Sequence, residues 1–154
     1  MKALIAFDSR SGYTEAIARA IGTTLGEHVE VGMVPASEAL ATAFAGLDLL
    51  VIGGPTEGHR ARAELRTVLT GLGHGTLPGL AAAAFDTRLD WPKLLSGSAA
   101  DEVARALKAA GCHLVAHPES FFVEGRAGRP SEAELEHART WATGLVSAVA
   151  VPLS

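Results

Sequence analysis

Apolar runs and amphipathic stretches alternate along this chain, beginning with an unbroken apolar run at residues 3–7. Such a run is typical of a strand that is buried on both faces of a sheet. A short polar segment follows, and then Ile17, Ile21 and Leu25 recur at every fourth position. This spacing places the three side chains on one face of a helix over residues 15–25. The chain is therefore predicted to begin as strand, polar loop and helix.

The same alternation continues toward the C-terminus. It predicts further strands at residues 28–34, 47–54, 80–85 and 112–123. It predicts further helices at residues 37–43, 61–72, 98–110 and 131–149. Serines are the expected caps of three of these helices, with Ser98-x-x-Asp101 and Ser131-x-x-Glu134 resembling capping boxes and Ser37 opening the short helix. Residues 55–59 and 86–97 are predicted to be loops.

Strands that alternate with helices indicate an α/β fold, in which a parallel sheet is covered by helices on both faces. The first, third and fourth strands are the most apolar and are expected in the centre. The second strand alternates in polarity and the fifth contains Pro118, so both suit the edges. With right-handed crossovers, the prediction is a five-stranded parallel sheet of order 2-1-3-4-5 in a single domain over residues 1–154.

Ligands of such sheets bind outside the carboxyl ends of the central strands. Three predicted loops meet there, at residues 8–14, 54–60 and 86–97. The first loop leads into a helix, whose free backbone N–H groups and dipole attract a phosphate. Gly12 allows a close approach of the backbone, and the hydroxyls of Ser9, Ser11 and Thr14 can donate hydrogen bonds. From this local pattern alone, a simple turn and helix cap is an equally good interpretation.

The sequence Ser9-x-Ser11-Gly12-x-Thr14 after the first strand resembles the phosphate loop of flavodoxins, which wraps the 5′-phosphate of FMN. Residues 49–56 are similar to the flavodoxin strand that ends in Gly-Ser/Thr-Pro-Thr/Ile. The likeness covers nearly the whole chain in order and length, and it matches the short-chain type, which lacks an insertion in the fifth strand. The resemblance implies a flavodoxin-like three-layer sandwich with FMN as its cofactor.

The resemblance also implies which residues hold the cofactor. The expected cofactor-binding residues are Ser9, Arg10, Ser11, Gly12, Tyr13 and Thr14 at the phosphate, and Pro55, Thr56, Glu57, Gly58, His59, Asp86, Thr87, Arg88 and Trp91 at the flavin ring. Flavodoxins usually stack the ring between aromatic residues, often a Trp and a Tyr. Residues 56–59 contain neither, so His59 and Trp91 are the candidates to cover the ring. We therefore expect weaker binding than in a flavodoxin with an aromatic sandwich.

Charges near the two ring loops bear on the redox behaviour that the resemblance implies. Three arginines face three acids in this region: Arg60, Arg62 and Arg88 against Glu57, Asp86 and Asp90. A guanidinium close to the ring would favour the reduced, negatively charged flavin by Coulomb attraction. Arg88 is the best candidate, because it lies just past the predicted end of the fourth strand. If these side chains point into solvent instead, their effect is screened.

Composition removes several classes of function. The net charge is −4 without a block of like charge, so nothing indicates a nucleic-acid partner. No apolar run reaches the length that crosses a membrane, and the single Cys112 allows no internal disulfide. The six histidines form no metal-binding pattern. We expect a cytoplasmic monomer.

The resemblance favours an FMN-binding electron-transfer protein that works with redox partner proteins, a reductase and an acceptor. Such a carrier has no catalytic residues of its own. One alternative is a small FMN-dependent NAD(P)H:quinone-type reductase. Another is a binding or regulatory domain that keeps the flavodoxin fold without a flavin. The sequence leaves these alternatives open.

Overall fold

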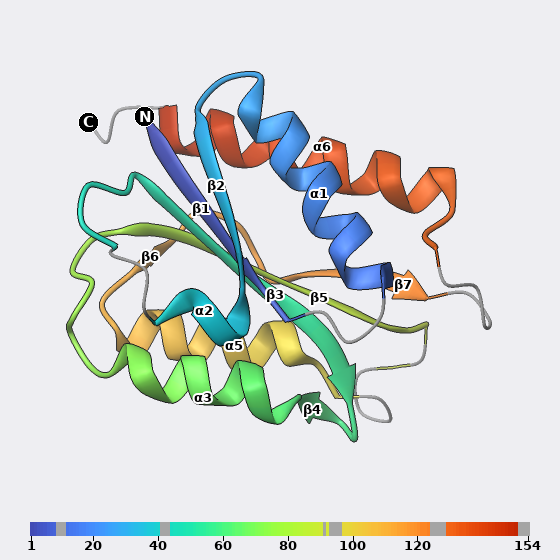
Figure 1. Cartoon of the computed structure of the whole chain (residues 1–154), viewed down its shortest axis with the longest axis horizontal. Coiled ribbons are helices and arrows are strands. Elements are labelled where there is room, and N and C mark those ends of the chain that lie inside the picture. The colour runs from blue at the N-terminus through green and yellow to red at the C-terminus, as the bar shows by residue number, and fades with distance from the viewer. Residues whose placement is uncertain (9–11, 41–43, 91, 93–96, 124–128, 151–154) are drawn as a thin grey trace.

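A parallel sheet runs through the middle of the computed structural model, which describes residues 1–8, 12–40, 44–90, 92, 97–123 and 129–150 (Figure 1). Its parallel strands are β1 (Lys2–Phe7), β2 (Glu30–Pro35), β3 (Leu49–Glu57), β5 (Ala81–Leu89), β6 (His113–Leu114) and β7 (Glu119–Val123). The order is β2-β1-β3-β5-β6, and β7 pairs with the far end of β5. A short strand, β4 (Arg60–Ala61), folds back antiparallel onto the end of β3.

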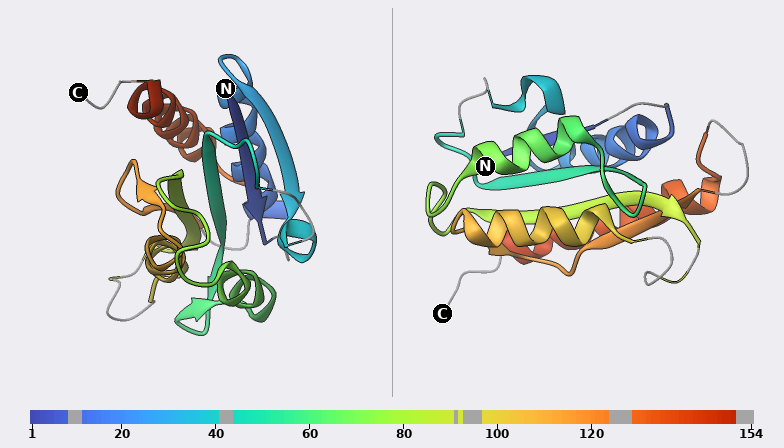
Figure 2. Two further views of the ribbon diagram at one scale, coloured as in Figure 1. Left: turned by 90° about the vertical axis from the view of Figure 1, so that its left-hand side faces the viewer. Right: turned by 90° about the horizontal axis from the view of Figure 1, so that it is seen from below.

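Helices cover both faces of this sheet and give the molecule three layers (Figure 2). One layer contains α1 (Gly12–Gly26) and α6 (Glu132–Ala150), which contact each other along their length. The other contains α3 (Ala63–Leu72), α5 (Ala99–Ala109) and the single turn α2 (Ala36–Ala39). The α/β sandwich and the order of its strands are therefore as predicted.

Two hydrophobic clusters, one on each face, hold the layers together. Neighbouring residues of a central strand point to opposite faces, so Leu50 packs in the cluster with α3 and α5 while Val51 packs in the cluster with α1 and α6. The middle of β5, residues 82–84, consists of buried alanines. These small side chains let both helical layers approach this central strand closely.

The edge strands behave as their sequences predicted. The second strand, β2, lies at one edge and has no fully buried residue. At the other edge, the predicted fifth strand is divided into β6 and β7, and Pro118 lies in the gap between them. Proline cannot donate a backbone hydrogen bond to a neighbouring strand, which explains the interruption.

The fourth strand is longer than predicted, and the prediction of a loop from residue 86 was wrong. Strand β5 continues through Asp86, Thr87 and Arg88 to Leu89. These polar residues remain in a strand because β7 pairs with the whole stretch, in a register that runs from Phe85 opposite Glu119 to Leu89 opposite Val123. The extended β5 therefore carries three of the predicted site residues.

The predicted loop at residues 55–59 is also mostly strand. Strand β3 continues to Glu57, a two-residue turn follows at Gly58 and His59, and β4 returns along β3. The expected helix from residue 61 consequently begins at Ala63. The pairing of Glu57 with Arg60 supplies the backbone hydrogen bonds that a loop would lack.

Helix starts were predicted with mixed success. Ser98 caps α5 by accepting a hydrogen bond from the Asp101 N–H, and Ser131 does the same for the Glu134 N–H. Ser37 is not a cap, because α2 starts at Ala36 behind Pro35 and ends at Ala39. The predicted continuation of this helix over residues 41–43 lies outside the described residues.

Candidate functional site

The carboxyl-terminal edge of the sheet lies on the right-hand side of Figure 1. Buried polar side chains gather at this edge. Here β1, β3 and β5 end side by side, in a register that aligns Phe7, Gly53 and Phe85. The buried polar residues at or near this edge are Asp8, Thr14, Asp86, Thr87, Arg88, Ser98 and Ser120. Because burying polar groups is costly unless they are paired, their concentration at one edge marks the candidate site.

The start of α1 lies at this edge. Gly12, Tyr13 and Thr14, predicted as loop residues, form the first turn of the helix, so their backbone N–H groups belong to its positive end. The buried Thr14 hydroxyl lies 2.7 Å from the hydroxyl of Thr87 on β5. Ser9, Arg10 and Ser11 lie outside the described residues.

Tyr13 has a different environment from the other residues of this turn. Its side chain is buried in the cluster under α1 and α6, and its hydroxyl donates a hydrogen bond to the backbone carbonyl of Phe122 on β7. The ring of Tyr13 therefore joins the helix start to the sheet edge. This leaves the backbone as the part of Tyr13 best placed for a ligand at the helix N-terminus.

The β3–β4 hairpin forms the second part of the site. Gly58 and His59 both have positive φ angles, 57° and 69°, which is typical of a two-residue type I′ turn. Gly97, just before α5, lies so close to this turn that a Cβ atom there would come within 2.0 Å of the His59 carbonyl oxygen. The turn is thus packed against the chain that leads into α5. Pro55 and Thr56 stand in β3, while Glu57 and His59 are exposed.

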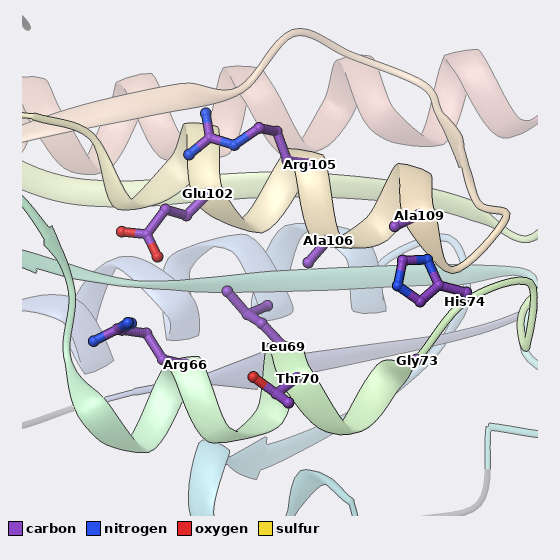
Figure 3. A pocket seen from close by; sticks show the side chains of 9 residues that line it. All are labelled: Arg66, Leu69, Thr70, Gly73, His74, Glu102, Arg105, Ala106 and Ala109. Atoms are coloured by element: carbon purple, nitrogen blue, oxygen red, sulfur yellow. The ribbon is translucent and has the colours of Figure 1, made fainter.

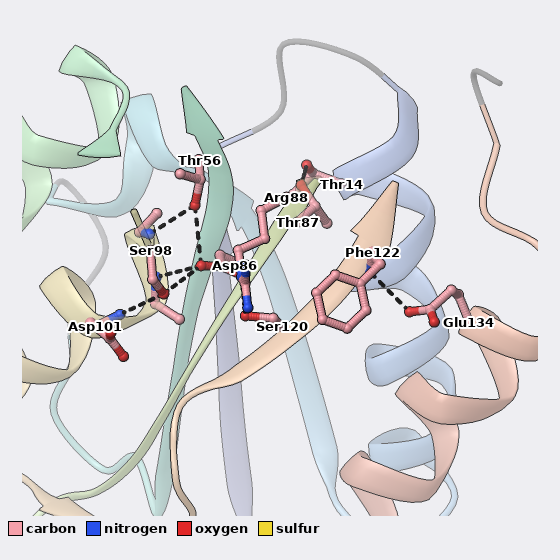
Figure 4. A network of polar contacts seen from close by, with 12 residues as sticks. Thr14, Thr56, Asp86, Thr87, Arg88, Ser98, Asp101, Ser120, Phe122 and Glu134 are labelled. Carbon is pink, nitrogen blue, oxygen red and sulfur yellow. Dashed lines mark hydrogen bonds and ion pairs between the residues drawn. The ribbon is translucent and has the colours of Figure 1, made fainter. Parts of the chain in front are cut away.

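A buried carboxylate connects this hairpin strand to α5 (Figure 4). The Oδ2 atom of Asp86 accepts hydrogen bonds from the Thr56 hydroxyl at 3.1 Å, the Ser98 hydroxyl at 2.7 Å and the Ala100 N–H at 3.0 Å. The Thr56 hydroxyl in turn accepts from the Ala99 N–H. Asp86 therefore holds the first turn of α5 against β3. Its side chain is buried within strand β5 and does not lie in an open loop.

Arg88 is buried, with an exposed fraction of 8%. Its Nε atom donates to the Ser120 hydroxyl at 2.9 Å, and the guanidinium lies 5.0 Å from the centre of the Phe122 ring. The same Nε atom is 3.9 Å from Asp86 Oδ1. Arg88 is thus shielded from solvent, and its charge is partly offset by Asp86.

Of the other two arginines, one is exposed and one is paired. Arg60 is exposed. Arg62 donates to Asp8 Oδ1 at 2.8 Å and lies 3.2 Å from Glu57 Oε2 through its Nε atom. Asp8 is only 2% exposed, and burial raises its pKa above the ordinary value, against the opposing effect of Arg62. The sequence analysis gave Asp8 no role, since its partner stands far away in the chain.

Two hollows are lined by residues of the helices α1, α3 and α5. One, of about 610 Å³, is lined by Asp8, Gly12, Glu15, Glu64 and neighbouring residues. The other, of about 430 Å³, lies between α3 and α5 and is lined by Arg66, His74, Glu102 and Arg105 among others (Figure 3). The second contains none of the predicted site residues, so the site is assigned to the carboxyl-terminal edge of the sheet.

This edge suits a phosphorylated ligand. The N-terminus of α1 offers backbone donors and a positive dipole end, and Thr14 adds a hydroxyl. Trp91, a predicted ring contact, lies outside the described residues. In the part of the chain that is described, no cluster of three His, Cys, Asp or Glu side chains could hold a metal ion. No described helix has both the length and the apolar character needed to cross a bilayer.

Neither the known protein-family models nor the curated protein sequences include a match to this chain. Solved structures do match. A short-chain flavodoxin associated with a non-canonical PDU bacterial microcompartment shares 20% identity at a TM-score of 0.81, covering 97% of this chain and 99% of that one. Oxidised flavodoxin 2 from Bacillus cereus shares 24% identity at a TM-score of 0.77, with 96% and 99% covered.

The same fold occurs as part of larger proteins. The rubredoxin oxygen:oxidoreductase from Desulfovibrio gigas is similar over 97% of this chain but only 37% of its own length, with 21% identity and a TM-score of 0.75. These likenesses confirm the flavodoxin fold for this chain.

Proposed function

We propose that this protein binds FMN and transfers electrons. The observation that carries the proposal is the combination of the flavodoxin fold over nearly the whole chain with a helix N-terminus, Gly12 and Thr14 at the switch point between β1 and β3. The backbone N–H groups at this helix start can donate hydrogen bonds to a bound anion without help from any side chain.

Different parts of the site fit the phosphate and the ring of FMN. The first turn of α1 would hold the phosphate, with the Thr14 hydroxyl as a further donor. The hairpin from Pro55 to His59 and the end of β5 would flank the ring, largely through backbone and polar groups. FMN, when bound, supplies the redox chemistry, and the chain contributes binding, orientation and the electrostatic surroundings of the ring.

The described part of the site offers no tryptophan or tyrosine ring to stack on the flavin. Tyr13 is packed beneath α1, and the residues of the hairpin are small, polar or histidine. A missing aromatic stack removes about 0.5–1.5 kcal/mol beyond the area buried. We therefore propose an FMN affinity below that of a flavodoxin with an aromatic sandwich, and a ring that His59 or Trp91 covers.

The proposed electron carrier acts on no substrate of its own, so it needs partner proteins. A carrier exchanges electrons with a reductase and an acceptor protein, and we propose that this chain does so as a monomer, without nucleic acid or a membrane.

The test is a spectroscopic titration of purified, flavin-free protein. FMN should bind with a shifted absorbance spectrum, and riboflavin, which has no phosphate, should bind far more weakly. Equal affinity for the two would refute the phosphate assignment, and no binding of either would favour a flavin-free domain. Rapid NAD(P)H oxidation with a quinone would favour the reductase alternative instead.

A further inference from the structure

One arginine joins two segments of the site that are far apart in the sequence. Arg62 stands between β4 and α3, and its NH1 atom donates to Asp8 Oδ1 at 2.8 Å. Its Nε atom lies 3.2 Å from Oε2 of Glu57. Asp8 is the first residue after β1, and Glu57 is the last residue of β3 before the hairpin turn. The guanidinium therefore spans the end of β1 and the base of the hairpin.

The Asp8 end of this bridge is built into the fold. The Asp8 N–H donates to the Gly53 carbonyl at 3.0 Å, which fixes the backbone. A Cβ atom at Gly54 would lie 2.9 Å from Leu65 Cδ2 and 3.0 Å from the Asp8 Cβ, so the glycine lets Asp8 pack closely against β3. Its Oδ2 atom is buried and has no hydrogen-bond partner among the described residues. Asp8 thus holds a carboxylate in a fixed place, where its Oδ1 atom accepts a hydrogen bond from Arg62.

Such an arrangement is not what stability alone would select. A buried carboxylate with one unpaired oxygen disfavours the folded state, and a neutral side chain of the same shape would avoid that cost. In some proteins buried ionic groups are retained because they fix a specific geometry. The two segments that Arg62 joins are those that lead to the phosphate and the ring in the proposed function. Their separation sets whether both ends of the ligand can be held at once.

We propose that Arg62 is a positioning residue whose bridge from Asp8 to Glu57 pre-organises the flavin site, and that protonation of Asp8 opens the bridge. This inference rests on the proposed function. Pre-organisation raises affinity because the ordering of the segments does not have to occur during binding. Arg62 acts through the two segments and needs no contact with the flavin.

The pH dependence follows from the groups around Asp8. Burial raises the pKa of Asp8, Arg62 opposes the rise, and Glu64 and Glu57 add to it. Glu15 and Arg19 of α1 line the hollow beside it. On protonation, the carboxyl loses its charge and its hold on Arg62 weakens. The bridge is therefore closed above the folded-state pKa of Asp8 and opens as the pH falls through it.

The first experiment measures FMN affinity in matched variants. Arg62→Gln should weaken FMN about tenfold, because a hydrogen bond to a charged group contributes that much. Arg62→Lys, which keeps the charge, should recover part of the loss. Arg66→Gln is the control, because Arg66 is an exposed arginine one turn further along α3. Equal affinity of Arg62→Gln and Arg66→Gln would overturn the proposal.

The second experiment follows FMN affinity against pH. The wild-type affinity should fall as the pH drops through the pKa of Asp8, whereas Arg62→Gln, which has no bridge to open, should lack this fall. The phosphate of FMN also titrates, near pH ~6. Asp8→Asn keeps that titration and removes the carboxyl, so it isolates the contribution of Asp8. A wild-type profile that coincides with that of Asp8→Asn would contradict the role of protonation.

The third experiment needs no flavin. Hydrogen exchange of the Arg60 amide, which pairs with Glu57, should be faster in Arg62→Gln than in wild type or Arg66→Gln, because the hairpin loses its tie to β1. If this difference appears while the wild type binds no FMN, the bridge exists and the proposed function fails. If the wild type binds FMN but neither affinity nor exchange changes in Arg62→Gln, the proposed function stands and the bridge has no role.

Discussion

Thr14 and Thr87 share a hydrogen bond between their buried hydroxyls, yet the proposed site gives a phosphate contact to Thr14 only. Thr14→Val should weaken FMN binding about tenfold or more, since a charge-assisted hydrogen bond is worth roughly 1.5–3 kcal/mol. Thr87→Val removes the same internal hydrogen bond and is the matched comparison. Fluorescence titration of both variants isolates the phosphate contact. Equal losses in the two would show that Thr14 acts only through Thr87.

Of Arg60 and Arg88, both proposed to lie near the flavin ring, Arg88 is buried, so solvent does not screen its charge as it screens that of Arg60. Asp86 lies 3.9 Å away and offsets part of this charge. Arg88→Met should make reduction of bound FMN harder, by up to about 1 kcal/mol, because a cation near the ring favours the added electrons.

The measurement for Arg88 is the reduction potential of bound FMN. Arg60→Gln is the control and should change the potential little. An unchanged potential in Arg88→Met would remove this residue from the flavin surroundings, and a rise would reverse the sign of the argument.

The individual contacts of the site could not be predicted from the sequence. Asp8 and Arg62 are 54 positions apart, and Thr14 and Thr87 are 73 apart. Periodicity and local motifs carry no information on pairings over such separations, which depend on the register of the sheet. The sequence did indicate the edge of the sheet at which the buried polar residues gather, because the carboxyl ends of parallel strands must meet there.

The start of α5 carries several polar contacts. Ser98 both caps the helix and donates to Asp86, whereas Ser131 only caps α6 at a more exposed place. Ser98→Ala should lower the free energy of unfolding by about 2 kcal/mol, since it removes a cap and leaves a buried carboxylate short of a donor. Ser131→Ala should cost about 1 kcal/mol. Urea denaturation of both variants tests this, and equal losses would mean that the bond to Asp86 adds nothing.

Strands were predicted where their residues are apolar and missed where they are polar. Residues 81–85 gave a strand, but Asp86, Thr87 and Arg88 resemble a loop and are held in β5 only because β7 runs beside them. The hairpin was missed for a related reason. Gly58 and His59 adopt a two-residue turn, yet only one of them is a glycine, and β4 is too short to show alternation.

At the scale of the molecule, the order of the strands followed from two simple features, the alternation in β2 and Pro118 at the opposite edge. Both reflect the same requirement, because a central strand needs two apolar faces and a full set of backbone donors. Pro118 marks the interruption of the last strand, but it does not reveal that the two parts pair with separate stretches of β5.

The stability of the whole molecule should depend on the pH through Asp8. Its pKa is raised in the folded state above the ordinary value of 3.8. The folded state therefore binds this proton more tightly, and the contribution of Asp8 to stability falls as the pH rises from about 3.8 through the raised pKa. Asp8→Asn should consequently be more stable than wild type at neutral pH, with the gain disappearing under acid conditions.

Thermal unfolding at a series of pH values tests the prediction for Asp8. A constant difference between the two proteins across the range would contradict it. A gain in stability together with weaker FMN binding would show that this carboxylate is kept for function at the expense of the fold.

The division of the last strand at Pro118 has a consequence for how the molecule can change. β6 and β7 each pair with β5 on their own, and His117 between them is exposed. A flexible segment inserted after His117 would leave both pairings intact, and closing a longer loop costs only about 0.6 kcal/mol for each doubling of its length. A variant with such an insertion should keep its far-ultraviolet circular dichroism and most of its unfolding free energy. The interruption between β6 and β7 is therefore a position where an added segment can supply a new surface while the sheet stays intact.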